Sequence, residues 1–343
     1  MTRFFLVCVV TASFKVASAQ TVPPDTSRAV IDSVYAIIQE QSLFRDRVDW
    51  TETDKTFRSA VDAAGTFAEA LDAFRLVFEA LDDVHSAIYY AGTGIAYRRP
   101  PSRPVVRDVR SLIMLSRERA NQPEGRMLPG GVGYVYVPAY GPIGPDPINE
   151  GARALRDVVC DLAAEAGNGW IVDLRVNEGG NIHPMLSGLG DLLGDGVVAR
   201  SVGSSGEAQF GWSIVDGVLS IDGYSAATVE RRCPEARELG PIAVLIGPAT
   251  LSSGQITAVA FAGWERARLF GDPTAEGYAT NNAWHQITPA LALNLSTAYF
   301  ADRSGYVHEG IVLPDEQVEG EWRLDDLEND PVVQRALAWI AQD

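Results

Sequence analysis

The chain has 343 residues but very little lysine and histidine. Its only lysines are Lys15 and Lys55, so a mechanism that depends on a catalytic lysine has almost no candidates. Histidine is the side chain whose ordinary pKa suits proton transfer near neutral pH. The candidates for such a role form a short list of four: His85, His183, His285 and His308.

Basic residues and long apolar runs are also scarce. The chain has 28 basic and 45 acidic residues, a net charge of −17. This charge repels nucleic acid and anionic membrane surfaces, so we expect neither as a partner. Beyond the amino terminus no stretch reaches about 18 uninterrupted apolar residues, so we expect no stable membrane insertion. With 46% hydrophobic residues, the composition is that of a soluble globular protein and leaves the oligomeric state open.

Residues 1–19 have the pattern of an export signal. Arg3 precedes an apolar run over residues 4–12, and Ala17-Ser18-Ala19 provides the small residues of a cleavage site. The run is too short to anchor the chain permanently in a membrane. We therefore expect a mature chain that begins near Gln20 and acts in the periplasm or outside the cell.

The chain has only three cysteines, and Cys8 lies in this leader. Export permits a disulfide between the other two, Cys160 and Cys233. Cys160 lies in a predicted amphipathic helix, where a buried free thiol is equally consistent with the sequence. Neither cysteine has a second cysteine or a histidine at metal-ligand spacing, so we infer no metal site and no cofactor.

Residues 20–90 are predicted to form a small helical domain. Apolar residues recur at helical spacing over residues 26–44. A second helix is expected from Thr66 to about Asp83, because Thr66 and Glu69 have the spacing of a capping box. The following segment, residues 91–130, is rich in arginine, proline and glycine and is expected to be a connector with one or two strands.

Strands and helices alternate over residues 131–343. Strands are predicted at 133–137, 170–174 and 242–246, from 268, and within 287–299. Helices are predicted at 148–166, 184–193, 253–264 and 331–341. This alternation favours a layered α/β domain with a largely parallel sheet.

A serine-containing turn directly follows the strand predicted at 242–246. It reads Gly-Pro-Ala-Thr-Leu-Ser-Ser-Gly-Gln over residues 247–255. Small residues at a strand-to-helix turn can expose a hydroxyl at the helix amino terminus, where free N–H groups favour a developing negative charge. Ser252 is therefore a candidate nucleophile, and an ordinary helix N-cap is the competing interpretation.

Two further motifs carry candidate catalytic groups. Asn177-Glu178-Gly179-Gly180 follows the strand at 170–174, where backbone N–H groups can form an oxyanion hole; a plain glycine turn is the alternative. Asp83-Val84-His85-Ser86 ends the second predicted helix. It supplies a histidine that could serve a serine as its base, although a lone histidine is more often structural.

Taken in order, these motifs resemble the C-terminal-processing and tricorn-like serine peptidase family. The resemblance covers about residues 26–343. It implies a crotonase-like (ClpP/crotonase) layered α/β domain preceded by a small helical domain. The segments that carry it are residues 83–86, 133–137, 173–180, 250–255, 271–274 and 314–315.

The resemblance also implies roles for individual residues. Ser252 takes the position of the nucleophile, and the oxyanion donors correspond to Gly179, Gly180 and Ser253. One branch of the family pairs the serine with a lysine shortly after the position of Thr274, where this chain has none. The tricorn-like branch uses a histidine from the helical region, and His85 matches that position. We therefore expect His85 to be the general base.

A third group should orient the imidazole. The tricorn-like branch has a glutamate a few residues before a Pro-Asp pair, and the spacing here is one residue short, so either Glu309 or His308 falls on it. Glu309 is our choice on chemical grounds, with Glu276 as the runner-up. The motifs also make Asn177 and His183 candidate substrate-binding residues, unless His183 is simply an exposed residue at a helix start.

The sequence thus predicts an exported serine peptidase that forms an acyl-enzyme at Ser252. Its expected partners are peptides or unfolded proteins. The stretch between residues 90 and 131 is too short for a PDZ module, so recognition of substrate carboxyl termini is not expected. The alternative is a non-catalytic binding module of the same fold whose cleft holds an apolar or peptide ligand. Retention of the nucleophile, the base and the glycines favours the enzyme.

Overall fold

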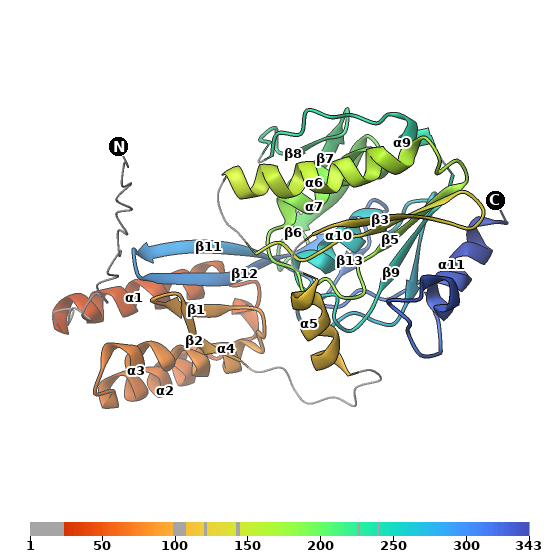
Figure 1. The fold of residues 1–343 in the computed structure, drawn as a ribbon. Helices are drawn as coiled ribbons and strands as arrows, with labels where there is room; N and C mark the ends of the chain where they lie inside the picture. Colours follow the sequence, from red (N-terminus) through yellow and green to blue (C-terminus); the bar gives the residue numbers. More distant parts are fainter. Residues whose placement is uncertain are drawn as a thin grey trace, which may run out of the picture.

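The computed structural model describes residues 24–98, 108–119, 122–141, 145–225, 227–238 and 240–342. The predicted export signal and Cys8 lie outside these ranges. A mainly helical region at the amino terminus stands beside a larger α/β region (Figure 1). Within the described ranges, no helix combines the length and apolar character needed to cross a membrane.

The amino-terminal region consists of helices around one apolar core. Its Thr66–Glu69 capping box forms as predicted. The helix expected from Thr66 is instead two helices, interrupted at Ala73, and one helix was not expected, with Phe57 and Val61 as its buried residues. The elements are α1 (Pro24–Gln41), η1 (Arg45–Arg47), α2 (Trp50–Ala63), α3 (Phe67–Asp72) and α4 (Phe74–Leu81).

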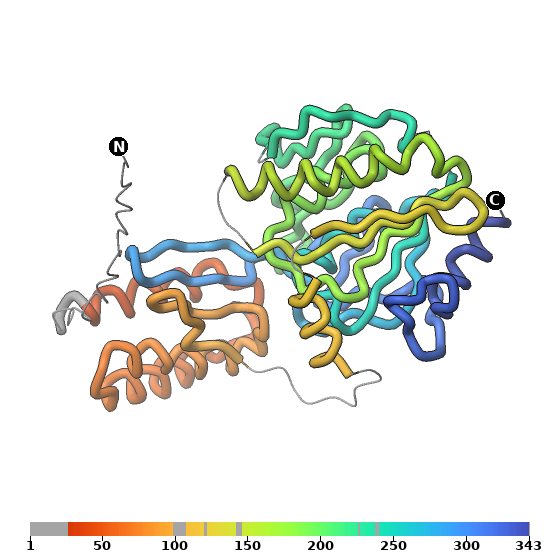
Figure 2. The backbone as a smooth tube through the Cα atoms, in the orientation of Figure 1, coloured from red at the N-terminus to blue at the C-terminus, as the bar shows by residue number. Residues whose placement is uncertain are grey.

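An eight-stranded sheet joins this region to the rest of the chain. Its main order is β2-β1-β12-β6-β7-β8, and β11 and β13 also pair with β12. Leu291, Leu293 and Leu295 of β12 pack into the helical core, and Figure 2 shows the β11–β12 hairpin lying along the amino-terminal helices. The strands are β1 (Ala87–Tyr90), β2 (Thr93–Tyr97), β6 (Gly196–Val202), β7 (Ala208–Val215), β8 (Val218–Ile221), β11 (Thr280–Thr288), β12 (Leu291–Ala301) and β13 (Val307–His308).

The second sheet has six strands in the order β14-β10-β9-β5-β4-β3. All neighbours run parallel except β3, which is antiparallel to β4. β5 and β9 are buried throughout, as expected of strands covered on both faces. The strands are β3 (Glu124–Leu128), β4 (Val132–Tyr136), β5 (Gly169–Asp173), β9 (Ile242–Ile246), β10 (Ala267–Gly271) and β14 (Glu316–Gln317).

Helices cover both faces of this sheet. Apolar residues of α6, α7 and α10 pack on one face, and α11 packs on the other. The layered α/β arrangement is therefore confirmed. The helices of this region are α5 (Val109–Glu118), α6 (Pro145–Ala163), α7 (Ile182–Gly188), α8 (Gly190–Leu193), α9 (Glu235–Glu238), α10 (Ser253–Phe261), η2 (Leu327–Asn329) and α11 (Pro331–Ile340).

Two parts of the fold differ from the sequence-based expectation, and the structure also answers a question about the cysteines that the sequence left open. The connector contains α5, which Asp108 caps by accepting from the Ser111 N–H, and the β1–β2 hairpin spans residue 90. Strands β6, β7 and β8 were not expected, and they extend the first sheet. Cys160 and Cys233, which the sequence left open, form a disulfide with 5.2 Å between their Cα atoms.

Candidate active site

Ser252 lies at the turn between β9 and α10 in a strained backbone conformation. Its φ is 49° and its ψ is −122°, and its side chain makes no capping hydrogen bond to α10. A positive φ at a residue other than glycine is costly and persists only where the surrounding structure enforces it. The hydroxyl of Ser252 is thus turned away from the N-cap role that the sequence allowed.

The hydroxyl points instead at His85, which lies on the turn after α4. Ser252 Oγ is 2.9 Å from His85 Nε2. The imidazole is largely enclosed, and Tyr278 packs edge-on against it with 5.1 Å between ring centroids. Burial lowers the pKa of His85 to about 4. A neutral imidazole within hydrogen-bond reach of a serine hydroxyl is the arrangement that general-base activation requires.

The second ring nitrogen of His85 contacts a hydroxyl group and not a carboxylate. His85 Nδ1 lies 2.8 Å from Thr280 Oγ1, at the start of β11. Among the described residues, no carboxylate has a hydrogen bond to this ring. Glu309 is exposed and lines a pocket of about 320 Å³ that also includes Glu276. The expectation that Glu309 orients the imidazole is corrected accordingly: Thr280 occupies that place.

His308, the other residue considered for that place, is buried elsewhere. Its Nε2 lies 3.1 Å from Asp302 Oδ2. This contact binds the residue into the turn between β12 and β13. Neither His308 nor Glu309 therefore supports the imidazole, because the Pro-Asp spacing locates a segment of chain but not the direction of its side chains.

The glycine loop after β5 lies next to Ser252. Gly179 and Gly180 have φ values of 90° and 99°. A Cβ on Gly179 would lie 2.8 Å from Ser252 Cβ, so the loop passes directly beside the serine. The Gly179 N–H donates to Asn177 Oδ1 at 2.9 Å. The expectation for Gly179 as an oxyanion donor is corrected, and the N–H groups of Gly180 and Ser253 are the remaining candidates.

Asn177 shapes this loop from inside the protein. Its side chain is fully buried, and its Nδ2 donates to the carbonyl oxygens of Val137 and Pro138, both at 3.0 Å. Its Oδ1 accepts from the Gly179 N–H, so both ends of the side-chain amide hydrogen-bond to the protein backbone. The expected substrate-binding role for Asn177 is therefore corrected to a structural one.

His183 lies in the first turn of α7, and Asn181 caps that helix. Its ring stacks on Trp212 with 5.9 Å between centroids, and its Nδ1 is buried without a hydrogen-bond partner. Burial lowers the pKa of His183. It is thus not the exposed residue that one interpretation allowed, and its contact with substrate stays a prediction.

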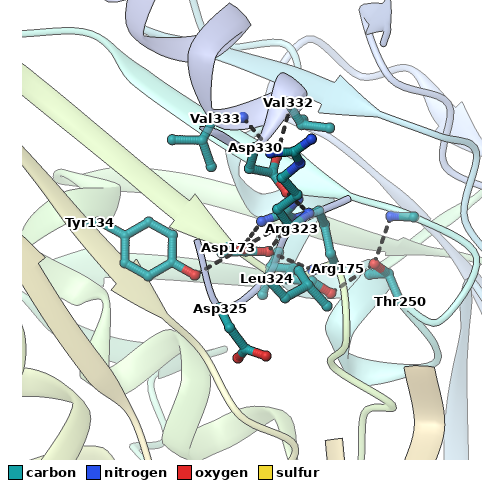
Figure 3. Close-up of polar contacts among 12 residues, drawn as sticks. Tyr134, Asp173, Arg175, Thr250, Arg323, Leu324, Asp325, Asp330, Val332 and Val333 are labelled. Carbon is teal, nitrogen blue, oxygen red and sulfur yellow. Dashed lines mark hydrogen bonds and ion pairs between the residues drawn. The ribbon is translucent and has the colours of Figure 1, made fainter. Parts of the chain in front are cut away.

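A buried ionic network supports the strand ends that carry these loops (Figure 3). Arg175 lies between Asp173, at 2.6 Å, and Asp330, at 2.8 Å. Burial alone would raise the pKa of Asp173, but the Arg175 guanidinium holds it below its ordinary value. Thr250 Oγ1 donates to the Leu174 carbonyl at 2.8 Å, which joins the serine turn to the end of β5.

A possible set of metal ligands occurs away from the site. In the described part of the chain, Cys160, Asp191 and Cys233 bring ligand atoms together. The two sulfurs are bonded to each other, and Asp191 pairs with the buried Arg156 at 2.7 Å. These atoms are already committed, so the set is not a metal centre in this state.

A comparison with known protein families identifies the family to which the chain belongs. The model for Peptidase family S41 matches residues 131–318. The chain belongs to peptidase family S41. The matched segment includes the serine turn, the glycine loop and Thr280, whereas His85 lies in the region before it.

Individual proteins resemble the chain over most of its length. The chain is 26% identical over 297 residues to a nisin-resistance protein of Lactococcus lactis subsp. lactis, covering 86% of this chain and 84% of the relative. A lipoprotein structure from Streptococcus agalactiae has a TM-score of 0.67 at 21% identity, covering 94% and 98%. A photosystem II D1 C-terminal processing protease has a TM-score of 0.56 at 14% identity, covering 90% and 97%. The structural likenesses show a shared fold.

Sequence reasoning missed Thr280 and its neighbour Asn282. Both lie in Thr-Asn-Asn at residues 280–282, within the segment after Thr274 that lacks the family's lysine. Three polar residues at the head of a β-rich segment are a signal, but a weak one, because an exposed strand end shows the same composition.

Proposed function

We propose that this S41 protein is an exported serine peptidase that hydrolyses peptide bonds through an acyl-enzyme at Ser252. The observation that carries the proposal is the 2.9 Å contact between Ser252 Oγ and His85 Nε2 at a strained turn. The family membership supports peptide hydrolysis as the reaction class. A peptide or an unfolded protein is the substrate that this chemistry fits.

The reaction follows from the groups around the serine. His85 Nε2 takes the proton of Ser252 as the oxygen attacks the scissile carbonyl. The N–H groups of Gly180 and Ser253 stabilise the negative charge that develops on the carbonyl oxygen. His85 then gives its proton to the leaving amine. Water, deprotonated by the same nitrogen, releases the acyl group and restores the serine.

Export is the second part of the proposal. It is supported by the leader pattern of residues 1–19 and by the Cys160–Cys233 disulfide, because disulfides persist in oxidising compartments. The names of two relatives, a nisin-resistance protein and a lipoprotein, are consistent with a role at the cell envelope. The test is N-terminal sequencing of the mature protein, which should begin near residue 20.

The test of catalysis uses the Ser252→Ala and His85→Ala variants. Each should lower hydrolysis of fluorescein-labelled denatured casein at least about a thousand-fold, because removing one member of such a pair removes most of its effect. Ser205→Ala, an exposed serine in the turn between β6 and β7, is the matched control and should keep full activity. Circular dichroism should show an unchanged fold in all three.

The same variants separate the peptidase from a binding module. A module that only holds a peptide would show no hydrolysis in the wild type, and none of the variants would differ from it in turnover. Hydrolysis that survives Ser252→Ala would show that the active site lies elsewhere and would refute the proposal.

A further inference from the structure

The Thr280 hydroxyl contacts the one imidazole nitrogen that the serine does not use. Thr280 Oγ1 lies 2.8 Å from His85 Nδ1, and only 4% of Thr280 is exposed. A histidine accepts a proton at Nε2 only when its own proton is on Nδ1. The group facing Nδ1 therefore decides whether His85 can serve as the base in the proposed function.

The surrounding hydrogen bonds determine where the Thr280 proton goes. Asn282 Nδ2 donates to the His85 carbonyl oxygen at 3.4 Å, which orients the amide. Asn282 Oδ1 then accepts the Thr280 hydroxyl proton at 2.8 Å. A hydroxyl has one proton to donate, so Thr280 can only accept from His85 Nδ1. This direction places the ring proton on Nδ1 and leaves the lone pair of Nε2 facing Ser252.

A carboxylate is nearby, but it supports the chain and not the ring. Asp83 Oδ1 accepts from the His85 backbone N–H at 2.9 Å and from Ser296 Oγ at 3.2 Å. Ser296 Oγ lies 3.3 Å from Thr280 Oγ1, so one hydroxyl separates the carboxyl group from Thr280. Among the residues that the structure describes, the titratable group that packs against the ring itself is the Tyr278 phenol.

We propose that Thr280, oriented by Asn282, is the positioning residue of a serine–histidine pair that works without a carboxylate partner. It acts through His85 by selecting the Nδ1–H tautomer and fixing the ring plane. The inference rests on the proposed peptidase function, and it adds the residue that replaces the acid of a triad. Because the hydroxyl is neutral, it orients the ring without stabilising the imidazolium as a carboxylate would.

The first test compares three substitutions at matched positions. Thr280→Val keeps the shape of the side chain and removes the acceptor, Thr280→Ser keeps the acceptor, and Thr297→Val removes a hydroxyl of β12 that bonds the Asn281 carbonyl instead. The readouts are kcat and KM for an internally quenched peptide copied from a casein cleavage site.

Thr280→Val should lower kcat about ten- to a hundred-fold with KM little changed, because an unsatisfied buried donor replaces a hydrogen bond. Thr280→Ser should recover kcat to within about three-fold of wild type, and Thr297→Val should match wild type. A Thr280→Val enzyme with unchanged kcat, or a Thr280→Ser enzyme as slow as Thr280→Val, would overturn the inference.

The second test observes the ring directly and needs no substrate. Long-range ¹H–¹⁵N spectra of protein labelled with ¹⁵N-histidine contain four ring systems, and His85→Gln identifies the one of interest. Wild type and Thr280→Ser should show the Nδ1–H tautomer, and Thr280→Val should lose it.

A wild-type ring protonated on Nε2 would overturn the inference whatever the activity. The spectra also test the positioning role of Thr280 separately from the proposed peptidase function. An Nδ1–H ring that depends on Thr280, in a protein that hydrolyses nothing, would retain the positioning role and refute the peptidase.

Discussion

Peptide hydrolysis should continue well below the pH at which an ordinary histidine stops acting as a base. The burial of His85 lowers its pKa from 6.5 to about 4, and the cause is the loss of solvent around the charged form. Its ring contacts the hydroxyls of Ser252 and Thr280, neither of which stabilises the imidazolium by charge. The neutral, active form of His85 should therefore persist in mildly acidic solution.

The size of this effect follows from the two pKa values. At pH 5 a histidine of pKa about 4 is about nine-tenths neutral, whereas one of pKa 6.5 is only about 3% neutral. The rate at pH 5, relative to the plateau near pH 8, should thus be about 30-fold higher than an ordinary histidine would allow. The acid limb of the kcat/KM profile should have its midpoint near pH 4.

The assay is kcat/KM for a quenched peptide between pH 3.5 and 8, because this ratio reports the free enzyme's pKa. Circular dichroism at each pH should separate protonation from unfolding. This control matters because the folded protein binds fewer protons at His85 than the unfolded chain between about pH 4 and 6.5, so the free energy of unfolding falls as the pH is lowered. An acid limb at pH 6 or above in a folded protein would refute the argument.

Three further predictions concern the groups that hold the site in place. Arg175→Met leaves two buried carboxylates without their partner and should lower the free energy of unfolding by about 3–5 kcal/mol in urea denaturation. Replacing Cys160 and Cys233 by serine opens a bridge across 73 residues and should lower it by about 2–4 kcal/mol. Gly179→Ala places a methyl group 2.6 Å from the Leu251 carbonyl oxygen and should lower kcat at least about a hundred-fold.

Each of these predictions has a control and a contrary outcome. Arg231→Met removes only exposed ion pairs and should cost less than about 1 kcal/mol; equal costs for the two arginine variants would contradict the buried network. Gly206→Ala has a similar positive φ but open space around it, and it should leave kcat unchanged. Dithiothreitol should destabilise the wild type and not the double serine variant, and an equal response would contradict the disulfide's role.

Local features of the chain were predictable where one element determines them. The segment 242–246 consists of five consecutive apolar residues, and it forms β9 because a parallel strand covered on both faces needs no polar side. The Thr66–Glu69 capping box and the proline at the start of α11 likewise mark the beginnings of helices, and each depends only on residues close by in the sequence. The serine turn and the glycine loop could be located because each directly follows such a strand.

Features that depend on pairing between distant segments were not predictable. Strands β6 and β7 mix exposed and buried positions irregularly, so they show neither a continuous apolar run nor a strict alternation. The connector helix α5 was not expected, because its apolar segment is short. Glu309 was wrongly chosen because a spacing along the chain carries no information about which way a side chain faces.

The sequence by itself determined the kind of chemistry. Two lysines and four histidines restricted the candidates for the base, and the motif after β9 located the candidate nucleophile, because composition and local turns need no knowledge of the fold. Only the tertiary structure decided how His85 is held. Thr280 is 195 residues from His85 along the chain and reaches it because β12 pairs with both β1 and β11. That contact arises from burial of the β12 leucines against the amino-terminal helices, a long-range packing effect that no local pattern records.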